Sequence, residues 1–402
     1  MQSLAAHSPP KRRRPWILAV AVLVVVGAGA GIAFAVTGGG GGGGAGGGSA
    51  ATGGSSATTD ASGVKTASDP SKPLTIVSTT PPKGTKNVTS NSTITVRFSA
   101  PLGTFRQTPT LSPTVSGTWS RTNATTLTFE PTAPFMPSAT ETLTIPGGPH
   151  GIVGSGGQHL ATTTPPVTFT IAQGSTARLQ QLLGQLGFLP LSYVEPSPAP
   201  APQDMALPQP GTLAWRWAGM PTQLTSLWTQ GEPNEITKAA IEAFENQNGL
   251  TVDGLAGPKV WAAVLADVAS GKGDTTPWDY VLVTKTLPQH LTLWVNGAVK
   301  YGNIAVNTGA PGADTVDGTY AVFEHVKASD MKGTNVTGST YNDPTVPWAR
   351  YFNGGDALHG FPRAHYGYPQ SNGCVEMPIT TAGNVWPYTP IGTLVTVVGP
   401  AS

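Results

Sequence analysis

The chain has 402 residues and a formal net charge of +1, and this charge is unevenly distributed. The basic residues KRRR at positions 11–14 supply +4, so the rest of the chain carries a net charge of about −3 and contains no further basic block. Nucleic-acid binding requires a basic stripe or patch, so this class of function is excluded. The length predicts two or three domains beyond the N-terminal region.

An uncharged apolar run, PWILAVAVLVVVGAGAGIAFAV, occupies residues 15–36 directly after the basic residues. A helix of this length crosses a hydrocarbon core of about 30 Å. We therefore expect a cytoplasmic basic tail at 1–14 and a single transmembrane helix at 15–36. The rest of the chain would lie outside the cell membrane, because basic residues stay on the cytoplasmic side. The alternative is a signal peptide, whose apolar region is usually shorter, about 7–15 residues.

Residues 37–71 are nearly all Gly, Ser, Ala and Thr, which is typical of a flexible linker. Residues 72–173 contain short alternating runs such as STITVRFSAPL and ATTLTFEP, punctuated by Pro, Gly and Asn. This pattern predicts a β-sandwich. The opening stretch STTPPKGTKNVTSNSTITVRFSAPL resembles the bacterial Ig-like domains of cell-envelope proteins, which implies a rigid spacer without catalytic residues.

Residues 174–272 combine helical patterns with a Pro-rich insertion near 195–210. The segments ARLQQLLGQLGFLP, NEITKAAIEAFENQ and GPKVWAAVL each predict a helix. Their order, with GLTVDGLAG between the last two, resembles the small three-helix peptidoglycan-binding domain, and Asp253, Gly254 and Gly257 match the turn of that family. The resemblance implies peptidoglycan glycan as a partner. Three tryptophans of the insertion either stack on a sugar or pack on the neighbouring domain: Trp215, Trp217 and Trp228.

Residues 278–400 are dominated by alternating runs such as YVLVTKT, GTYAVFEHV and IGTLVTVVG. The segment VNGAVKY places Asn-Gly between two strands, which is a strong hairpin signal. A compact β-rich domain with little helix is expected. The fold class predicted for the chain is therefore multidomain and mainly β, with a transmembrane helix, an Ig-like sandwich, a three-helix domain and a β-rich C-terminal domain.

The sole cysteine, Cys374, lies in the segment YPQSNGCVEMP. Outside the membrane, cysteines usually form disulfides in pairs, and one cysteine has no partner within the chain. Three interpretations remain: an inert buried residue, an intermolecular disulfide, or a nucleophile.

The surrounding sequence ALHGFPRAHYGYPQSNGCVEMP decides between them. A strand ending VNTG, the turn TVDGTYAV, His359-Gly360 and a later Ser371-Asn372-Gly373-Cys374 resemble the YkuD-type catalytic domain of L,D-transpeptidases. The resemblance covers the whole C-terminal domain. It implies that Cys374 is the nucleophile and His359 the proton donor and acceptor. Asn372 stands where the family usually has a second histidine, so a proton relay at 372 is lost while a role in holding the loop is kept.

The chemistry expected of Cys374 and His359 also follows from their side chains alone. A thiol of pKa near 8.5 is mostly protonated at neutral pH, and only the thiolate attacks a carbonyl. A nearby imidazolium lowers the thiol pKa, so we expect His359 to keep Cys374 ionised. Fourteen residues separate the two, enough for a loop between strands to bring them together. The amides of Gly373 and Cys374 would then hold the oxyanion.

Other candidates are weighed by their surroundings. His365 is a less favoured base, His325 is expected to be structural, and Asp356 either orients His359 or is an exposed loop carboxylate. Metal-binding spacings such as H-E-x-x-H are absent from the sequence, so no metal or other cofactor is expected. Three aromatic residues either line a peptide groove or, equally, pack beside the loop: Trp348, Tyr351 and Tyr368.

The resemblance implies a membrane-anchored enzyme that acts on peptidoglycan in cell wall biogenesis and cell shape. Cys374 would attack the third residue of a stem peptide and release D-alanine, and an amine of a neighbouring stem would resolve the thioester into a 3→3 cross-link. Carbapenems are expected to acylate the same residue. Two alternatives stay open. Water could resolve the thioester, giving an L,D-carboxypeptidase, or the chain could be a non-catalytic wall-binding scaffold.

Overall fold

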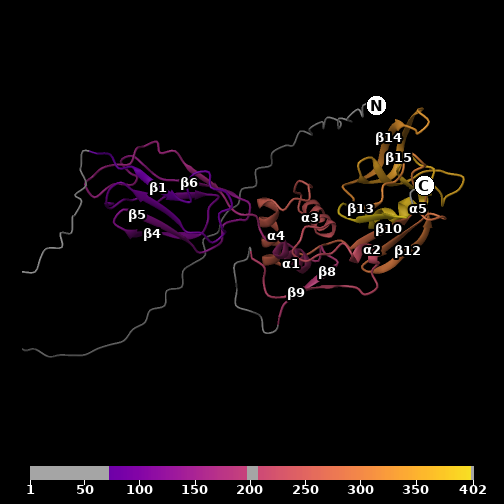
Figure 1. Ribbon diagram of the computed structural model, residues 1–402, viewed down its shortest axis with the longest axis horizontal. Helices are drawn as coiled ribbons and strands as arrows, with labels where there is room; N and C mark the ends of the chain where they lie inside the picture. The colour runs from indigo at the N-terminus through magenta and orange to yellow at the C-terminus, as the bar shows by residue number, and fades with distance from the viewer. Residues whose placement is uncertain (1–71, 197–206, 400–402) are drawn as a thin grey trace, which may run out of the picture. The chain divides into compact units, whose positions relative to one another are not determined.

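The computed structural model describes residues 72–196 and 207–399 (Figure 1). The basic tail, transmembrane helix and linker expected for residues 1–71 lie outside this part of the chain. Within the two described ranges, no helix is both long and apolar enough to cross a membrane. The described chain is multidomain and mainly β, as the sequence predicts.

The Ig-like region contains two sheets that enclose one core. The first has the order β1-β2-β5-β4 and the second the order β3-β6-β7. Alternation buries one face of each strand, as in β2, where the first, third and fifth residues are buried. The strands are β1 (Ile76–Thr80), β2 (Ile94–Phe98), β3 (Thr110–Ser112), β4 (Gly117–Asn123), β5 (Thr126–Pro131), β6 (Thr140–Thr144) and β7 (Val167–Thr170).

Three main helices follow in the predicted order: α1 (Thr176–Leu186), α3 (Glu235–Gln247) and α4 (Pro258–Ser270). Helix α1 begins at Ser175, whose side chain accepts a hydrogen bond from the amide of Arg178, and ends at Gly187 with a φ of 89°. The insertion adds a two-stranded sheet and a short helix: β8 (Leu191–Val194), β9 (Thr212–Trp215) and α2 (Thr222–Thr225).

The three tryptophans of the insertion pack against other side chains of the protein and do not project into solvent. Trp217 lies with its ring centroid 5.8 Å from that of Trp278, and the Arg216 guanidinium covers it at 4.3 Å. Trp215 and Trp228 are partly buried against the helical core. Of the two interpretations, the structure favours packing over sugar stacking.

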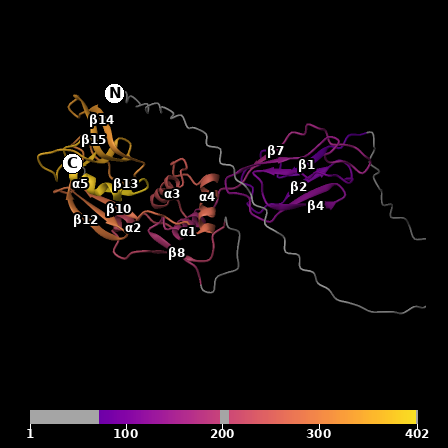
Figure 2. The ribbon, with the colours of Figure 1, turned by 180° about the vertical axis from the view of Figure 1, so that it is seen from behind.

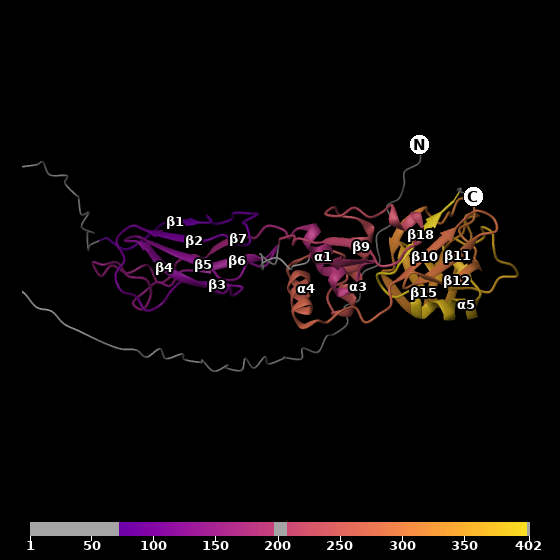
Figure 3. The same ribbon diagram turned by 90° about the horizontal axis from the view of Figure 1, so that it is seen from below.

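The C-terminal domain is built on two sheets. The first has the order β12-β11-β10-β18-β13, and Figure 3 shows β18, β10, β11 and β12 lying together in it. Its central strand β10 pairs antiparallel with β11 and parallel with β18, so both of its neighbours come from the same domain. The strands are β10 (Asp279–Thr284), β11 (His290–Val295), β12 (Ala298–Ala305), β13 (Gly318–Ala321) and β18 (Leu394–Val398).

The second sheet carries the predicted nucleophile loop and has the order β14-β15-β16-β17. Its long hairpin of β14 (Glu324–Thr334) and β15 (Thr340–Asn353) is visible in Figures 1 and 2. Strands β16 (Asp356–Gly360) and β17 (Val375–Met377) run parallel beside it. Helix α5 (Ile379–Val385) and the 3-10 turn η1 (Trp386–Tyr388) follow β17, and α5 contacts both β15 and β16.

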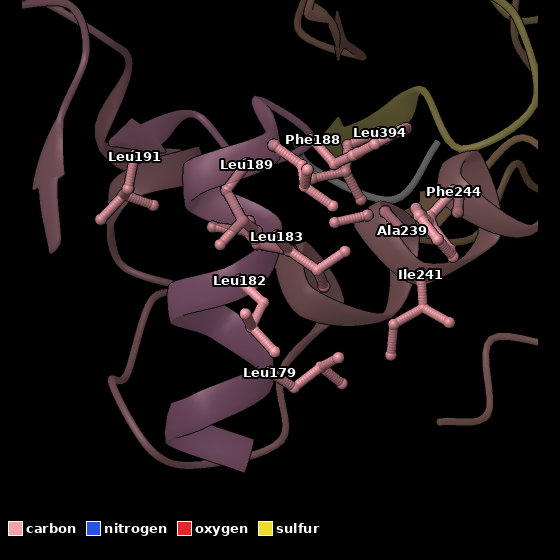
Figure 4. Packing of buried hydrophobic residues seen from close by; sticks show 14 of the residues in the cluster. Leu179, Leu182, Leu183, Phe188, Leu189, Leu191, Ala239, Ile241, Phe244 and Leu394 are labelled. Carbon is pink, nitrogen blue, oxygen red and sulfur yellow. The ribbon is translucent and has the colours of Figure 1, made fainter. Parts of the chain in front are cut away.

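One apolar cluster joins the helical region to the C-terminal domain. Leu182, Leu183 and Phe244 of the helices share it with Tyr280 and Leu394 of the first sheet, all of them at most 2% exposed. Figure 4 shows Leu394 beside Phe188, with the side chains of α1 and α3 around them. The two regions therefore share a continuous core.

Candidate active site

Strand register places Cys374 and His359 on one face of the second sheet. In the parallel pair β16–β17, Leu358 is opposite Val375 and His359 is opposite Glu376. Successive side chains of a strand point to opposite faces. Leu358 and Val375 point into the core, where both are 0% exposed. Cys374, directly before Val375, therefore lies on the other face, diagonally next to His359.

The loop before Cys374 is held by two hydroxyl groups. Ser371 Oγ donates to the carbonyl of Cys374 at 2.5 Å and accepts a long bond of 3.3 Å from the amide of Gly373. Thr315 Oγ1 donates to the carbonyl of Gly373 at 2.6 Å and accepts from the amide of Gly309. Gly373 has a φ of 113°, a conformation that L side chains rarely adopt. These bonds fix the backbone on either side of the sulfur.

His359 is buried, with 2% of its surface exposed. Its Nδ1 lies 3.2 Å from the carbonyl oxygen of Gly360. A carbonyl only accepts, so Nδ1 carries the hydrogen and Nε2 is left as the proton acceptor of the neutral ring. Burial lowers the pKa of His359, and this outweighs the opposing influence of Glu376. Gly360 is needed for close packing, since a Cβ there would lie 2.9 Å from the Cα of Ile379 in α5.

The surroundings of Cys374 disfavour its thiolate form. Burial raises the pKa of the thiol to about 12, and the carboxylates of Asp356 and Glu376 act in the same direction, whereas a backbone hydrogen bond from Ala357 acts against them. The thiol donates to the carbonyl of Gly355, at 3.7 Å from Sγ. Desolvation thus acts against both charged forms of the thiolate–imidazolium pair that the sequence predicts.

Asp356 lies against the nucleophile loop and not against His359. Its Oδ1 occupies the space beside the Cα of Gly373 where a side chain would begin. Its Oδ2 accepts a long bond of 3.5 Å from the amide of Asn353. Burial raises the pKa of Asp356 to about 6. It is neither an orienting partner of the imidazole nor a fully exposed carboxylate.

A bidentate ion pair covers the other side of His359. Arg363 donates from Nε and Nη2 to the two carboxylate oxygens of Glu376, each at 2.7 Å. Glu376 is opposite His359 in the register and is buried. The sequence reading did not anticipate this pair, whose two members are thirteen residues apart.

The three aromatic candidates do not lie together. Tyr351 is opposite Ala357 in the register, on the face that carries His359, and its hydroxyl bonds Ser329 Oγ at 2.8 Å. Trp348 instead packs on α5 and η1, with its ring 5.4 Å from that of Trp386. Of the two interpretations of Trp348, the structure favours packing. Tyr368 is 40% exposed.

Tyr341 is a further residue near the site that was not predicted from the sequence. The pKa of Tyr341, on β15, is raised by burial and by the nearby Cys374, and the same two causes act on Tyr351. Both phenols therefore lie near the sulfur. Since both belong to the β14–β15 hairpin, that hairpin forms one wall of the site.

The remaining histidines stand apart from the sulfur. His325 stacks on Trp386 with ring centroids 3.5 Å apart, which is a packing role. His365 is exposed. Asn372, at the position of the family's second histidine, donates to Asn335 Oδ1 at the tip of the hairpin at 2.7 Å. Across residues 72–196 and 207–399, no group of acidic, histidine or cysteine side chains is arranged to hold a metal ion.

Comparison with family models identifies the domain that carries Cys374 and His359. Residues 279–397 match the model of the L,D-transpeptidase catalytic domain. The C-terminal domain is an L,D-transpeptidase catalytic domain. The chain is therefore an enzyme of the L,D-transpeptidase type. Residues 70–171 match a bacterial Ig-like domain, and residues 229–264 match a peptidoglycan binding domain. These matches agree with the three regions that the sequence predicts.

Solved L,D-transpeptidase structures are also similar. The one from Mycobacterium smegmatis is 13% identical, covers 82% of this chain and all of its own, and has a TM-score of 0.28. LdtMt1 in complex with imipenem is 12% identical, with coverages of 80% and 98% and a TM-score of 0.28. The catalytic domain of the Enterococcus faecium enzyme is 23% identical over 31% of this chain and 100% of its own, with a TM-score of 0.28. No curated protein matches the chain.

Proposed function

We propose that this L,D-transpeptidase is anchored in the cell membrane and forms 3→3 cross-links through a thioester on Cys374. One observation carries the proposal. The β16–β17 register puts the only thiol of the chain diagonally beside a buried imidazole whose Nε2 is free to accept a proton. A neutral Cys–His pair of this kind is activated when the proton moves during attack.

Acylation begins from the neutral pair. His359 Nε2 takes the thiol proton as Sγ of Cys374 attacks the carbonyl of the third stem residue, a diaminopimelate-type L-centre. The amides of Gly373 and Cys374 donate to the oxyanion, a contribution of about 3–4 kcal/mol per donor in comparable sites. The amide of Gly373 is available because its bond to Ser371 Oγ is long, at 3.3 Å. His359 then gives its proton to the departing amine of D-alanine.

Deacylation reverses the roles of the histidine. An amine of a neighbouring stem attacks the thioester, and His359 carries a proton from the attacking nitrogen to the sulfur. Water in place of the amine would make the enzyme an L,D-carboxypeptidase. The donor stem would lie along the face of the second sheet, beside Tyr351 and Tyr341 of the hairpin.

Carbapenems are proposed as inhibitors that acylate the same sulfur. Solved L,D-transpeptidases have been described with imipenem and with a faropenem-derived adduct, so members of the family bind such compounds. The strained lactam carbonyl would take the position of the stem carbonyl.

The proposed location follows from the order of segments along the chain. The basic residues at 11–14 and the apolar run at 15–36 support a single-pass anchor with the enzyme on the extracytoplasmic side. The peptidoglycan binding domain supports peptidoglycan as partner. The Ig-like domain, which lies between the anchor and the other two in sequence, would act as a spacer.

The test is intact-mass analysis of the full chain in detergent after incubation with a stem tetrapeptide. The expected result is a mass increase equal to the tripeptide acyl group, with release of D-alanine, and no adduct on Cys374→Ala. A Cys374→Ala variant that still becomes acylated would overturn the assignment. A wild-type chain that forms no adduct with either the tetrapeptide or a carbapenem would favour the scaffold interpretation.

A further inference from the structure

The turn that leads into β16 faces the nucleophile loop with oxygen atoms. The Gly355 carbonyl oxygen lies 3.7 Å from Cys374 Sγ. Asp356 Oδ1 stands beside the Cα of Gly373. The Ala313 carbonyl oxygen is 3.8 Å from the position that a Cβ of Gly373 would take. Two acceptors thus lie beside Gly373 and a third lies beside the sulfur of Cys374, and we call these three oxygen atoms the oxygen cluster.

The carboxylate in this cluster lacks a compensating cation. Asp356 takes part in none of the ion pairs found within residues 72–196 and 207–399. In the same ranges it accepts a hydrogen bond from the side-chain amide of Asn353, at the long distance of 3.5 Å. The charged and titratable groups that face it are Cys374 and Tyr320, and neither carries positive charge. A half-buried carboxylate without a cationic partner is costly, and a bound cation would remove that cost.

The chemistry of the cluster selects its ligand. Acceptor oxygens alone require a ligand that only donates, and a carboxylate favours one that is positively charged. The second substrate of the proposed cross-linking reaction is a primary amine, which is an ammonium ion at neutral pH because amines of this type have a pKa near 10.4. An ammonium has three N–H donors for the three oxygens.

We propose that the oxygen cluster binds the ammonium group of the amine acceptor, and that Asp356 directs the thioester towards aminolysis and away from hydrolysis. This inference rests on the proposed transpeptidase function and names the residue that distinguishes the acceptor from water. Asp356 would hold the amine next to the acyl group, so that the effective concentration of the amine exceeds that of competing water.

Aminolysis of the thioester conserves atoms and charge. The bound ammonium releases one proton to solvent, and its nitrogen attacks the thioester carbonyl. The C–N bond forms and the C–S bond breaks. A second proton passes from the attacking nitrogen through His359 Nε2 to the departing sulfur, which restores the thiol of Cys374. No oxidant, reductant or further reactant is needed.

The test compares Asp356→Asn with the wild type in the full chain in detergent. Each protein is acylated with a stem tetrapeptide, and the acyl-enzyme is offered Nα-acetyl-lysine amide, a primary amine that is an ammonium ion at pH 7.5. Mass spectrometry measures the ratio of amide product to hydrolysed product. We expect the ratio, measured per acyl-enzyme formed so that a change in the acylation rate does not enter it, to be at least about tenfold lower, since a hydrogen bond to a charged group is lost. Hydroxylamine, an uncharged nucleophile at this pH, should be used equally by both proteins.

Two controls make the result specific. Glu130→Gln removes an exposed carboxylate from the Ig-like domain and should leave the ratio unchanged. In the wild type, the ratio divided by the fraction of amine in its neutral form should fall as the pH drops through about 6, where Asp356 gains a proton. This second measurement still tests the idea if Asp356→Asn does not fold.

The possible outcomes distinguish a failure of the acceptor site from a failure of the transpeptidase function. An unchanged ratio in Asp356→Asn, or an equal loss with hydroxylamine, overturns the acceptor site while the transpeptidase function stands. A wild-type protein that never forms the thioester overturns the proposed function itself.

Discussion

Replacing Arg363 by glutamine tests how the ion pair beside His359 controls the general base. In the wild type, Arg363 neutralises Glu376 through two bonds of 2.7 Å, and the side chain of Glu376 is only 5% exposed. Without Arg363, that carboxylate is left buried and unpaired. Breaking a buried ion pair in this way typically costs about 3–5 kcal/mol of folding free energy, so the thermal unfolding midpoint of the domain should fall clearly.

The same change should shift the pH dependence of acylation. Four neighbours influence the pKa of His359: Glu376 and the Gly360 carbonyl raise it, whereas Arg350 and Arg363 lower it. Loss of Arg363 therefore raises the pKa of His359. The neutral imidazole is the active form and exists above its pKa, so the acid limb of the rate profile moves to higher pH. Activity should fall more at pH 6 than at pH 8.

The assay is the rate of acylation by a stem tetrapeptide between pH 5 and pH 9, read by intact mass. Glu376→Gln in the Arg363→Gln background removes the unpaired charge and should return the acid limb towards its wild-type position. An acid limb that stays in place in Arg363→Gln, or that moves to lower pH, would refute the electrostatic reasoning. A purely structural role for the pair would lower the rate equally at every pH.

Three further predictions concern the nucleophile and its loop. Iodoacetamide should alkylate Cys374 far more slowly than free cysteine between pH 6 and pH 8, because burial raises the thiol pKa; rapid labelling at pH 6 would indicate a thiolate. Thr315→Val should lower folding stability by about 1–3 kcal/mol and slow acylation, because the carbonyl of Gly373 loses its donor, whereas Thr315→Ser should preserve both quantities in thermal unfolding and mass assays. Asn372→Ala removes one exposed bond to Asn335 and should change the acylation rate by less than about tenfold; a complete loss of acylation would assign Asn372 a direct chemical role.

Much of the architecture could be predicted because the local sequence pattern of a strand is enough to identify it. The alternation in ITVRF or YVLVT predicts a half-buried or buried strand without knowledge of its partners. The three helices of the middle region were equally visible, since Asn234 and Pro258 mark the starts of α3 and α4. Strand order and pairing depend on distant segments, as in the parallel contact between β10 and β18, and the sequence reading did not specify them.

The site was predictable only where its residues are close in sequence. The motif around His359 and Cys374 is local, but Thr315 reaches Gly373 across 58 positions. The sequence left groove lining and packing open for Trp348, because its contact with Trp386 depends on how the segment after β17 folds back onto β15. The direction of the pKa shift of Cys374 depends on burial, which is a property of the folded chain.

The continuous core between the helices and the first sheet has a consequence for dissecting this enzyme. Tyr280 and Leu394 share one apolar cluster with Phe188 and Phe244 of the helical region, and Phe244 lies within the peptidoglycan binding domain. An excised transpeptidase domain would expose these side chains to water, and it should self-associate or lose thermal resistance. Exchange of domains between related enzymes would then succeed only when the helical region and the catalytic domain are transferred together.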